Sequence, residues 1–389
     1  MLEQLKQQVI ELFRQSYHCD PKVLGIAPGR VELLGNHTDY NGGVVLSSAL
    51  DRCTIVAAAP ADIEGVELIS TMYPTVERLG RWDKNPKSPW TNYVMGVLKE
   101  LDEAGVKLGG MRMAVASSVP GGSGLSSSAA LEVATAKAAL ALFPKEFAKM
   151  DLAKLCQRAE NRFVGMNCGL LDQFSSVFGA EDSALFLDCL SFETRTIPFG
   201  AHDIAIIVAN SMTKHALVDG EYNRLRENCM QAAAALGKAV GRDVKLLREI
   251  SLEEFEAHKN VLTPDQRRRA QHVMYENQRV LDGIAALERH DLVTFGKQLF
   301  ASHASSRDLF GNSVENLDIL VELAASGPGV IGARLCGGGF GGSTVNLVHS
   351  AQAEAFMAHL AEGFEKRVGK KTEIHWCGIG DGARAEMLG

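Results

Sequence analysis

The segment PGGSGLSSSAA, residues 120–130, constrains the fold of this chain more than any other feature. It lies between a β-rich run at 112–119 and an alanine-rich run of strong helical character from Ala129. Glycines let the backbone approach an anion closely, and the first amides and the positive dipole end of the following helix point to the same place. The order strand, glycine loop, helix therefore predicts a phosphate-binding loop, although a turn with an ordinary serine cap has the same pattern.

Three consecutive hydroxyls at 126–128 add donors and metal ligands to this loop. The loop is not a P-loop, because no Gly-Lys pair in the chain is followed by Ser or Thr. The residues expected to surround the phosphates are Pro120, Gly121, Gly122, Ser123, Gly124, Leu125, Ser126, Ser127 and Ser128.

Length and charge argue against several classes of protein. The chain has 389 residues, and its 47 acidic and 40 basic residues give a net charge of -7, whereas a dedicated nucleic-acid binder needs a basic excess. No apolar run reaches the length of a membrane span, and the first residues form an amphipathic pattern rather than a signal peptide. The eight cysteines include no CxxC pair. We therefore expect a cytoplasmic protein with no nucleic-acid and no membrane partner.

The hydrophobic patterning predicts an α+β protein. Short β-rich runs, such as 53–59, precede alanine-rich helices in the first half of the chain. In the second half, helical periodicity extends from Tyr222 to about Ala325. An apolar run at 204–210 precedes it, and short strands are expected after it, at 332–336, 343–348 and 373–377. This arrangement predicts a small sheet with helices on one face.

A second glycine cluster, GGGFGG at 337–342, contains a formal GxGxxG pattern. A dinucleotide site requires a helix after this pattern, whereas here the strand-like STVNLV follows. Five glycines in six positions are more typical of a tight loop that a ligand or another loop approaches than of a loose linker.

Polar side chains crowd around a short apolar strand in the segment 28–43. Arg30, Asn36, His37 and Asp39 offer fixed donors and acceptors, which suit a polyhydroxylated ligand. A polar loop capped by Asp39 is the alternative explanation.

Asp172 lies in the apolar setting LLDQF, twelve positions after Glu160. A carboxylate in such surroundings is costly unless it is paired, so Asp172 is a candidate functional acid. A helix cap or a structural ion pair would also explain it.

These segments, in this order, resemble the GHMP small-molecule kinases, and within them the galactokinase branch. GRVELLGNHTDYNGG is similar to the family's first motif, usually GRVNLIGEHTDYN, while PGGSGLSSSAALEVA and PGVIGARLCGGGFGGSTV are similar to its second and third. HTDY together with CGLLDQF points to the galactokinase branch, and the resemblance extends from about residue 20 to the end.

The resemblance implies a two-lobed α+β fold with ATP and a sugar between the lobes. Residues 1–200 would form an N-terminal lobe like ribosomal protein S5 domain 2, and residues 201–389 a ferredoxin-like C-terminal lobe. The implied function is ATP-dependent phosphorylation of the anomeric hydroxyl of galactose, with ATP and Mg²⁺ bound, by a monomer or weak homo-oligomer.

Site residues follow from the same resemblance. Asp172 matches the family's catalytic aspartate, which accepts the proton of the anomeric hydroxyl, and Arg30 matches the arginine beside it. Ser128 and Glu160 match the Mg²⁺ ligands. The other matched positions are Asn36, His37, Asp39, Gly169 and Tyr222 for the sugar, Trp90 for adenine and Lys214, where the family usually has Arg, for phosphate.

Two positions depart from the family pattern, because Glu32 replaces the usual Asn and Asn36 the usual Glu. That glutamate ordinarily contacts the far end of the hexose, so the sugar stays open between galactose and an amino sugar, a uronic acid or a pentose. A non-catalytic sensor of galactose and ATP is a further alternative. Glu32 is expected on the same strand face as Arg30, where it could pair with Arg30 or supply a replacement carboxylate.

Overall fold

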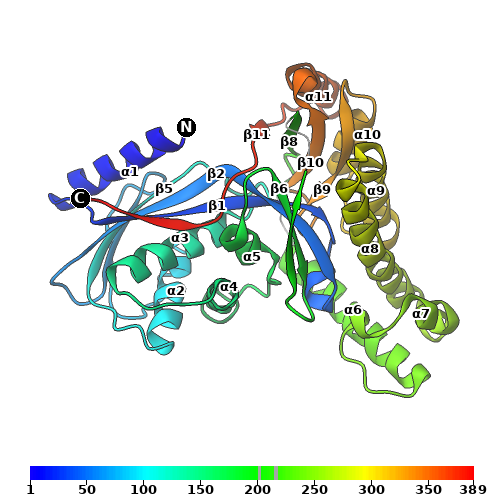
Figure 1. Cartoon of the computed structure of the whole chain (residues 1–389), viewed down its shortest axis with the longest axis horizontal. Coiled ribbons are helices and arrows are strands. Elements are labelled where there is room, and N and C mark those ends of the chain that lie inside the picture. Colours follow the sequence, from blue (N-terminus) through cyan, green and yellow to red (C-terminus); the bar gives the residue numbers. More distant parts are fainter. Residues whose placement is uncertain (200–202, 214–217) are drawn as a thin grey trace.

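The computed structural model describes residues 1–199, 203–213 and 218–389 as two sheets surrounded by helices (Figure 1). The helices are α1 (Leu2–Tyr17), α2 (Thr91–Glu103), α3 (Ser127–Leu142), α4 (Lys149–Arg158), α5 (Leu171–Phe178), α6 (Val218–Val240), α7 (Leu252–His258), α8 (Pro264–Glu288), α9 (Leu292–Ser305), α10 (Glu315–Ala325) and α11 (Ala353–Val368). Shorter helical segments near the site are η1 (Asp39–Asn41), η2 (Ala159–Val164) and η5 (Ser306–Phe310).

The larger sheet has eight strands within the described residues: β1 (Val23–Leu34), β2 (Val44–Pro60), β3 (Val66–Ser70), β4 (Glu77–Leu79), β5 (Met111–Ser117), β6 (Ser183–Asp188), β7 (Thr194–Pro198) and β12 (Arg384–Met387). The order is β12-β1-β2-β5-β3-β4, and β6 pairs with β2 and β7. Strand β12 brings the C-terminal end of the chain to the edge of β1, as the red ribbon in Figure 1 shows.

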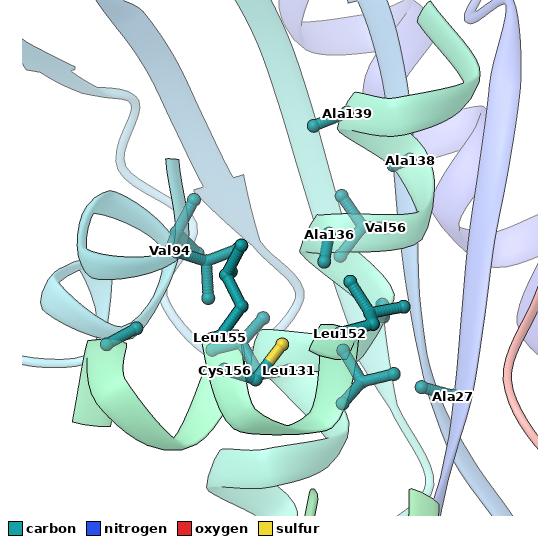
Figure 2. Close-up of a cluster of buried hydrophobic side chains, with 14 of the residues drawn as sticks. Ala27, Val56, Val94, Leu131, Ala136, Ala138, Ala139, Leu152, Leu155 and Cys156 are labelled. Carbon is teal, nitrogen blue, oxygen red and sulfur yellow. The ribbon is translucent and has the colours of Figure 1, made fainter. Parts of the chain in front are cut away.

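Both faces of this sheet are buried because successive residues of a strand point to opposite sides. The face toward α1 carries Leu24, Ile26, Ile55 and Ala57. The other face, toward α2, α3 and α4, carries Val23, Ala27, Val56 and Ala58, and Figure 2 shows part of that core. The amphipathic N-terminal segment is therefore a helix that covers one side of the sheet, as its pattern predicts.

The smaller sheet has the order β11-β8-β10-β9 and is antiparallel throughout. Its strands are β8 (Ile204–Asn210), β9 (Val330–Cys336), β10 (Ser343–His349) and β11 (Ile374–Cys377). The last three lie where the sequence predicts strands, and β8 is the apolar run at 204–210. Helices α10 and α11 cover one face. The other face is also apolar and packs against α8, α9 and the strands of the larger sheet, so the prediction of helices on one face only is wrong.

The predicted succession of strand, glycine loop and helix is confirmed. Strand β5 ends at Ser117, and α3 begins at Ser127 after the loop. The predicted boundary between lobes at residue 200 lies outside the described residues, so that division of the chain stays a prediction. Among the residues described, no helix is long and apolar enough to cross a membrane.

Candidate active site

A cavity of about 250 Å³ lies where β1, η1, α5, α6 and the second glycine loop meet. Its volume is near the lower end of small-molecule sites. The predicted catalytic and sugar-binding residues line it: Arg30, Asn36, His37, Asp39, Gly169, Asp172 and Tyr222. The cavity therefore gathers the predicted catalytic pair and every predicted sugar-binding position.

Arg30 and Asp172 form an ion pair at one wall of this cavity. The guanidinium donates from Nε at 2.9 Å and from Nη2 at 2.6 Å to the same carboxylate oxygen, Oδ1, and from Nη1 at 2.6 Å to the carbonyl of Gly124. Burial alone would lower the pKa of Arg30, but the Asp172 carboxylate raises it further above its usual value, so the guanidinium stays charged. No described residue donates to Oδ2 of Asp172, whose side chain is 25% exposed, so this oxygen is available to a ligand.

Asp39 is the first residue of η1. Its carboxylate fits beside Gly169 because Gly169 has no side chain. Oδ1 of Asp39 accepts from the amide of Tyr40 at 2.9 Å, and a Cβ built on Gly169 would stand 1.6 Å from Oδ2. Burial raises the pKa of Asp39 to about 7. Gly169 therefore positions Asp39.

Gly169→Ala is expected to weaken sugar binding by about tenfold or more while leaving ATP binding intact, because the methyl group must displace the Asp39 carboxylate. Calorimetric titration of the sugar and of the nucleotide, each alone, measures both quantities. Gly220→Ala is a useful control, because a Cβ there meets no atom within 4 Å and Gly220 does not line the cavity. Equal sugar affinity in wild type and Gly169→Ala would contradict this role.

His37 forms the wall between η1 and the second glycine loop. Its Nε2 lies 3.0 Å from the carbonyl of Gly338, which only accepts, so Nε2 carries the proton and Nδ1 accepts from the Tyr40 hydroxyl at 2.8 Å. Burial lowers the pKa of His37 to about 3. Both nitrogens are thus used within the protein, so His37 has no polar side-chain atom left for a ligand.

His272→Gln is expected to make the free energy of unfolding less sensitive to acid between about pH 6.5 and pH 4. Burial lowers the pKa of His272 to about 4, so in this range the unfolded chain binds a proton that the folded chain does not. Stability due to this group is therefore lost as the pH falls, by up to about 1.4 kcal/mol per pH unit. Urea unfolding at several pH values measures the slope, and an unchanged slope in the variant would contradict the burial of a neutral imidazole.

The two glycine loops lie against each other. Gly122 and Gly124 have positive φ, and a Cβ on Gly124 would stand 3.2 Å from the carbonyl of Cys336, at the start of the second loop. Ser126 caps α3, and its hydroxyl is buried without a partner among the described residues. The expectation that another loop approaches the second glycine cluster is confirmed.

Trp90 and Lys214 are the two predicted nucleotide contacts outside the glycine loop. Trp90 lies at the start of α2 and stacks on Tyr73, with ring centroids 5.7 Å apart and an interplanar angle of 8°. It does not line the cavity, and its role at adenine stays a prediction. Lys214 falls outside the described residues.

Ser128 and Glu160 lie together, as the predicted metal site requires. Burial and the charge of Asp172 raise the pKa of the Glu160 carboxylate, and the nearby Ser128 hydroxyl lowers it. Within the parts of the chain that the structure describes, no three His, Cys, Asp or Glu side chains form a metal-binding group. Two oxygen donors next to buried acidic groups fit Mg²⁺, which prefers hard oxygens and completes its shell with water and phosphate.

Sequence reasoning missed the buried polar groups that support these residues. Gln173 Nε2 donates to Glu160 at 2.7 Å and to Glu132 at 2.9 Å, which fixes the orientation of Glu160. Glu276 of α8 accepts from the amides of Gly35, at 3.0 Å, and Asn36, at 3.3 Å, and so anchors the loop before η1. A single carboxylate within an apolar helix, as in AALEVATAKAALALF, was the available signal for Glu132.

Three family models match this chain. The one described as the GHMP kinases N terminal domain matches residues 92–180, and that described as GHMP kinases C terminal matches residues 284–366. The galactokinase galactose-binding signature matches residues 11–60. The fold and the paired glycine loops are thus those of a GHMP kinase.

Individual relatives narrow this class. Galactokinase from Roseiflexus sp. (strain RS-1) is 41% identical, over 97% of this chain and 96% of the relative, and galactokinase from Homo sapiens is 39% identical, over 97% and 95%. The crystal structure of Lactococcus lactis galactokinase complexed with galactose superposes with a TM-score of 0.92 at 32% identity, over 97% of this chain and 99% of that one. The chain belongs to the galactokinase family.

Proposed function

We propose that this protein transfers the terminal phosphoryl group of ATP to the anomeric hydroxyl of galactose. The observation that carries the proposal is the position of Arg30, which binds Asp172 on one side and the carbonyl of Gly124 on the other. One buried cation thus links the acid that would receive the sugar hydroxyl to the loop that would hold the phosphates.

In this mechanism Oδ2 of Asp172 accepts the proton of the anomeric hydroxyl or orients it toward the phosphorus. Arg30 fixes the carboxylate through Oδ1 and offsets negative charge that develops on the transferred group. The amides at the start of α3 and of the preceding glycine loop bind the triphosphate. Transfer is direct and in line: the anomeric oxygen bonds to the terminal phosphorus of ATP as the bond to ADP breaks. The protein contributes mainly by positioning the reactants and neutralising charge.

Ser128 and Glu160 would hold Mg²⁺. The positive charge of the ion would offset the negative charge of the phosphates. The Ser128 hydroxyl and the Glu160 carboxylate supply the protein ligands, and Gln173 keeps the carboxylate in place.

Ser128→Ala and Glu160→Gln are expected to raise the Mg²⁺ concentration needed for half-maximal activity, by about tenfold or more, because each removes an oxygen ligand or its charge. Magnesium titrations at saturating ATP and sugar measure the shift. Ser16→Ala provides a matched serine control away from the site, because its hydroxyl donates to the carbonyl of Leu12 within α1. Unchanged titrations in both variants would contradict the metal assignment.

A panel of free sugars, with ATP and release of ADP as the readout, tests the proposed function. Galactose should give the highest kcat/KM, above galactosamine, galacturonate and arabinose. Turnover of another sugar ahead of galactose would overturn the substrate, and binding of both ligands without turnover would identify a sensor. We further propose a cytoplasmic location, which agrees with the eight cysteines that are free in the described residues. We also propose that the protein is a monomer or a weak homo-oligomer.

A further inference from the structure

The side chain of Asn36 has no hydrogen-bonding capacity left for a ligand. Its Nδ2 donates to Oε2 of Glu32 at 3.0 Å and to the carbonyl of Gly337 at 2.8 Å. Its Oδ1 accepts from Asn312 at 2.8 Å and from Ser306 at 3.2 Å. These four bonds use both amide protons and both lone pairs. Although Asn36 lines the cavity, its side chain is a structural support.

Glu32 is placed differently. Its Oε2 accepts from Asn36, from the amide of Gly337 at 3.3 Å and from Nη2 of Arg334 at 3.5 Å. Arg334 is fully buried and offsets the charge of the carboxylate. No described residue donates to Oε1, and Glu32 lines the cavity. A carboxylate oxygen that lies at a cavity wall and has no donor within the protein can accept a hydrogen bond from a ligand hydroxyl.

Glu32 and Asp172 meet the cavity beside different partners. Arg30 and Glu32 lie two residues apart on β1, where pairing with β2 continues without a shift from Ala49 to Ser47, so their side chains point to one face and their Cα atoms are about 6.6 Å apart. Arg30 holds Asp172, whereas the ion pair of Glu32 is with Arg334. Both carboxylates line the same cavity, so a sugar whose anomeric hydroxyl lies at Asp172 presents another part of its ring to Glu32.

We infer that Glu32 determines which sugar is bound, by accepting through Oε1 a hydrogen bond from the C4 or C6 hydroxyl, at the end of the ring opposite the phosphorylated carbon. This inference rests on the proposed function. Asn36 and Arg334 are positioning residues that hold the other oxygen of the carboxylate. A carboxylate at this point excludes a uronic acid by charge repulsion and disfavours a pentose, which lacks C6.

Positional deoxy sugars test this assignment. The measurements are kcat/KM, and calorimetric Kd without ATP, for galactose, its 2-, 4- and 6-deoxy analogues and galacturonate. In wild type, loss of one hydroxyl, at C4 or C6, should cost about 10- to 100-fold, and galacturonate should bind more weakly still. In Glu32→Ala that cost should fall to within about threefold, while the effect of the 2-deoxy change stays as in wild type. Glu32→Gln introduces an amide that can hydrogen-bond a hydroxyl but removes the charge, so it should relieve the penalty on galacturonate.

Glu100→Gln is the matched control, because Glu100 is a buried carboxylate paired with Arg158 and lies outside the cavity lining. It should leave every ratio between sugars unchanged. An equal loss for all five sugars in Glu32→Ala, an unchanged cost of the C4 and C6 deletions in Glu32→Ala, or an unchanged penalty on galacturonate in Glu32→Gln would overturn the inference. Wild type that binds galactose without phosphorylating it would overturn the proposed function alone, since the Kd ratios still test Glu32, and wild type that does not bind galactose would overturn both.

Discussion

Asp172→Asn is expected to lower kcat by about 10³-fold, with the Kd of ATP within about twofold of wild type. The amide preserves the shape of the side chain and can still accept from Arg30, but it cannot take the proton of the sugar hydroxyl. Steady-state kinetics and nucleotide titration on one preparation measure both quantities.

Asp188→Asn serves as the control, because Asp188 is a carboxylate paired with Arg248 and lies outside the cavity lining. It should retain full turnover. If Asp172→Asn kept a tenth of wild-type kcat, Asp172 would be a structural ion-pair partner rather than the base.

Arg30→Met is expected to lower kcat by about 10²- to 10³-fold and to reduce the free energy of unfolding by about 1–3 kcal/mol. The substitution removes the cation that holds Asp172 and the donor to Gly124, and it leaves a half-buried carboxylate unpaired. Kinetics at saturating substrates and urea unfolding measure the two effects.

Arg30→Lys separates charge from geometry. Lysine keeps the positive charge but cannot donate in the fixed fork that reaches Asp172 and Gly124 together, so stability should recover more than kcat does. Full recovery of kcat in Arg30→Lys would show that charge alone matters, and wild-type kcat in Arg30→Met would remove Arg30 from the mechanism.

Local sequence patterns predicted the elements that carry the site. The amphipathic spacing of the first residues, the glycine loop before α3 and the apolar runs of the smaller sheet each depend on neighbours along the chain, and each has the predicted form. The segment 28–43 also presents Arg30, His37 and Asp39 to one cavity, because they lie on a strand, on the loop after it and on the short helix that follows.

Long-range partners could not be predicted in the same way. Asn36 was expected to meet the sugar, yet its bonds go to Gly337 and Asn312, about three hundred residues later in the chain. Glu32 was expected to pair with Arg30 or to serve as a replacement carboxylate, and its ion pair is with Arg334. Such contacts depend on how the smaller sheet packs against β1, which no local pattern specifies.

The resemblance to a kinase family supplied the role of each residue, and the structure supplies physical reasons for several of them. The family resemblance assigned Gly169 to sugar binding. In the structure, the lack of a side chain at Gly169 leaves room for the Asp39 carboxylate. His37 was assigned in the same way, but its two nitrogens bond to Tyr40 and Gly338.

The central claim is that Asp172, Arg30 and the glycine loop act together to phosphorylate the anomeric hydroxyl of galactose. Phosphorus NMR of the products formed from ATP and galactose, recorded for wild type and Asp172→Asn in parallel, tests it most directly. The account predicts one sugar phosphate, coupled to the anomeric proton, in wild type and almost none in the variant. A phosphate coupled to any other sugar proton, or equal product from both proteins, would contradict it.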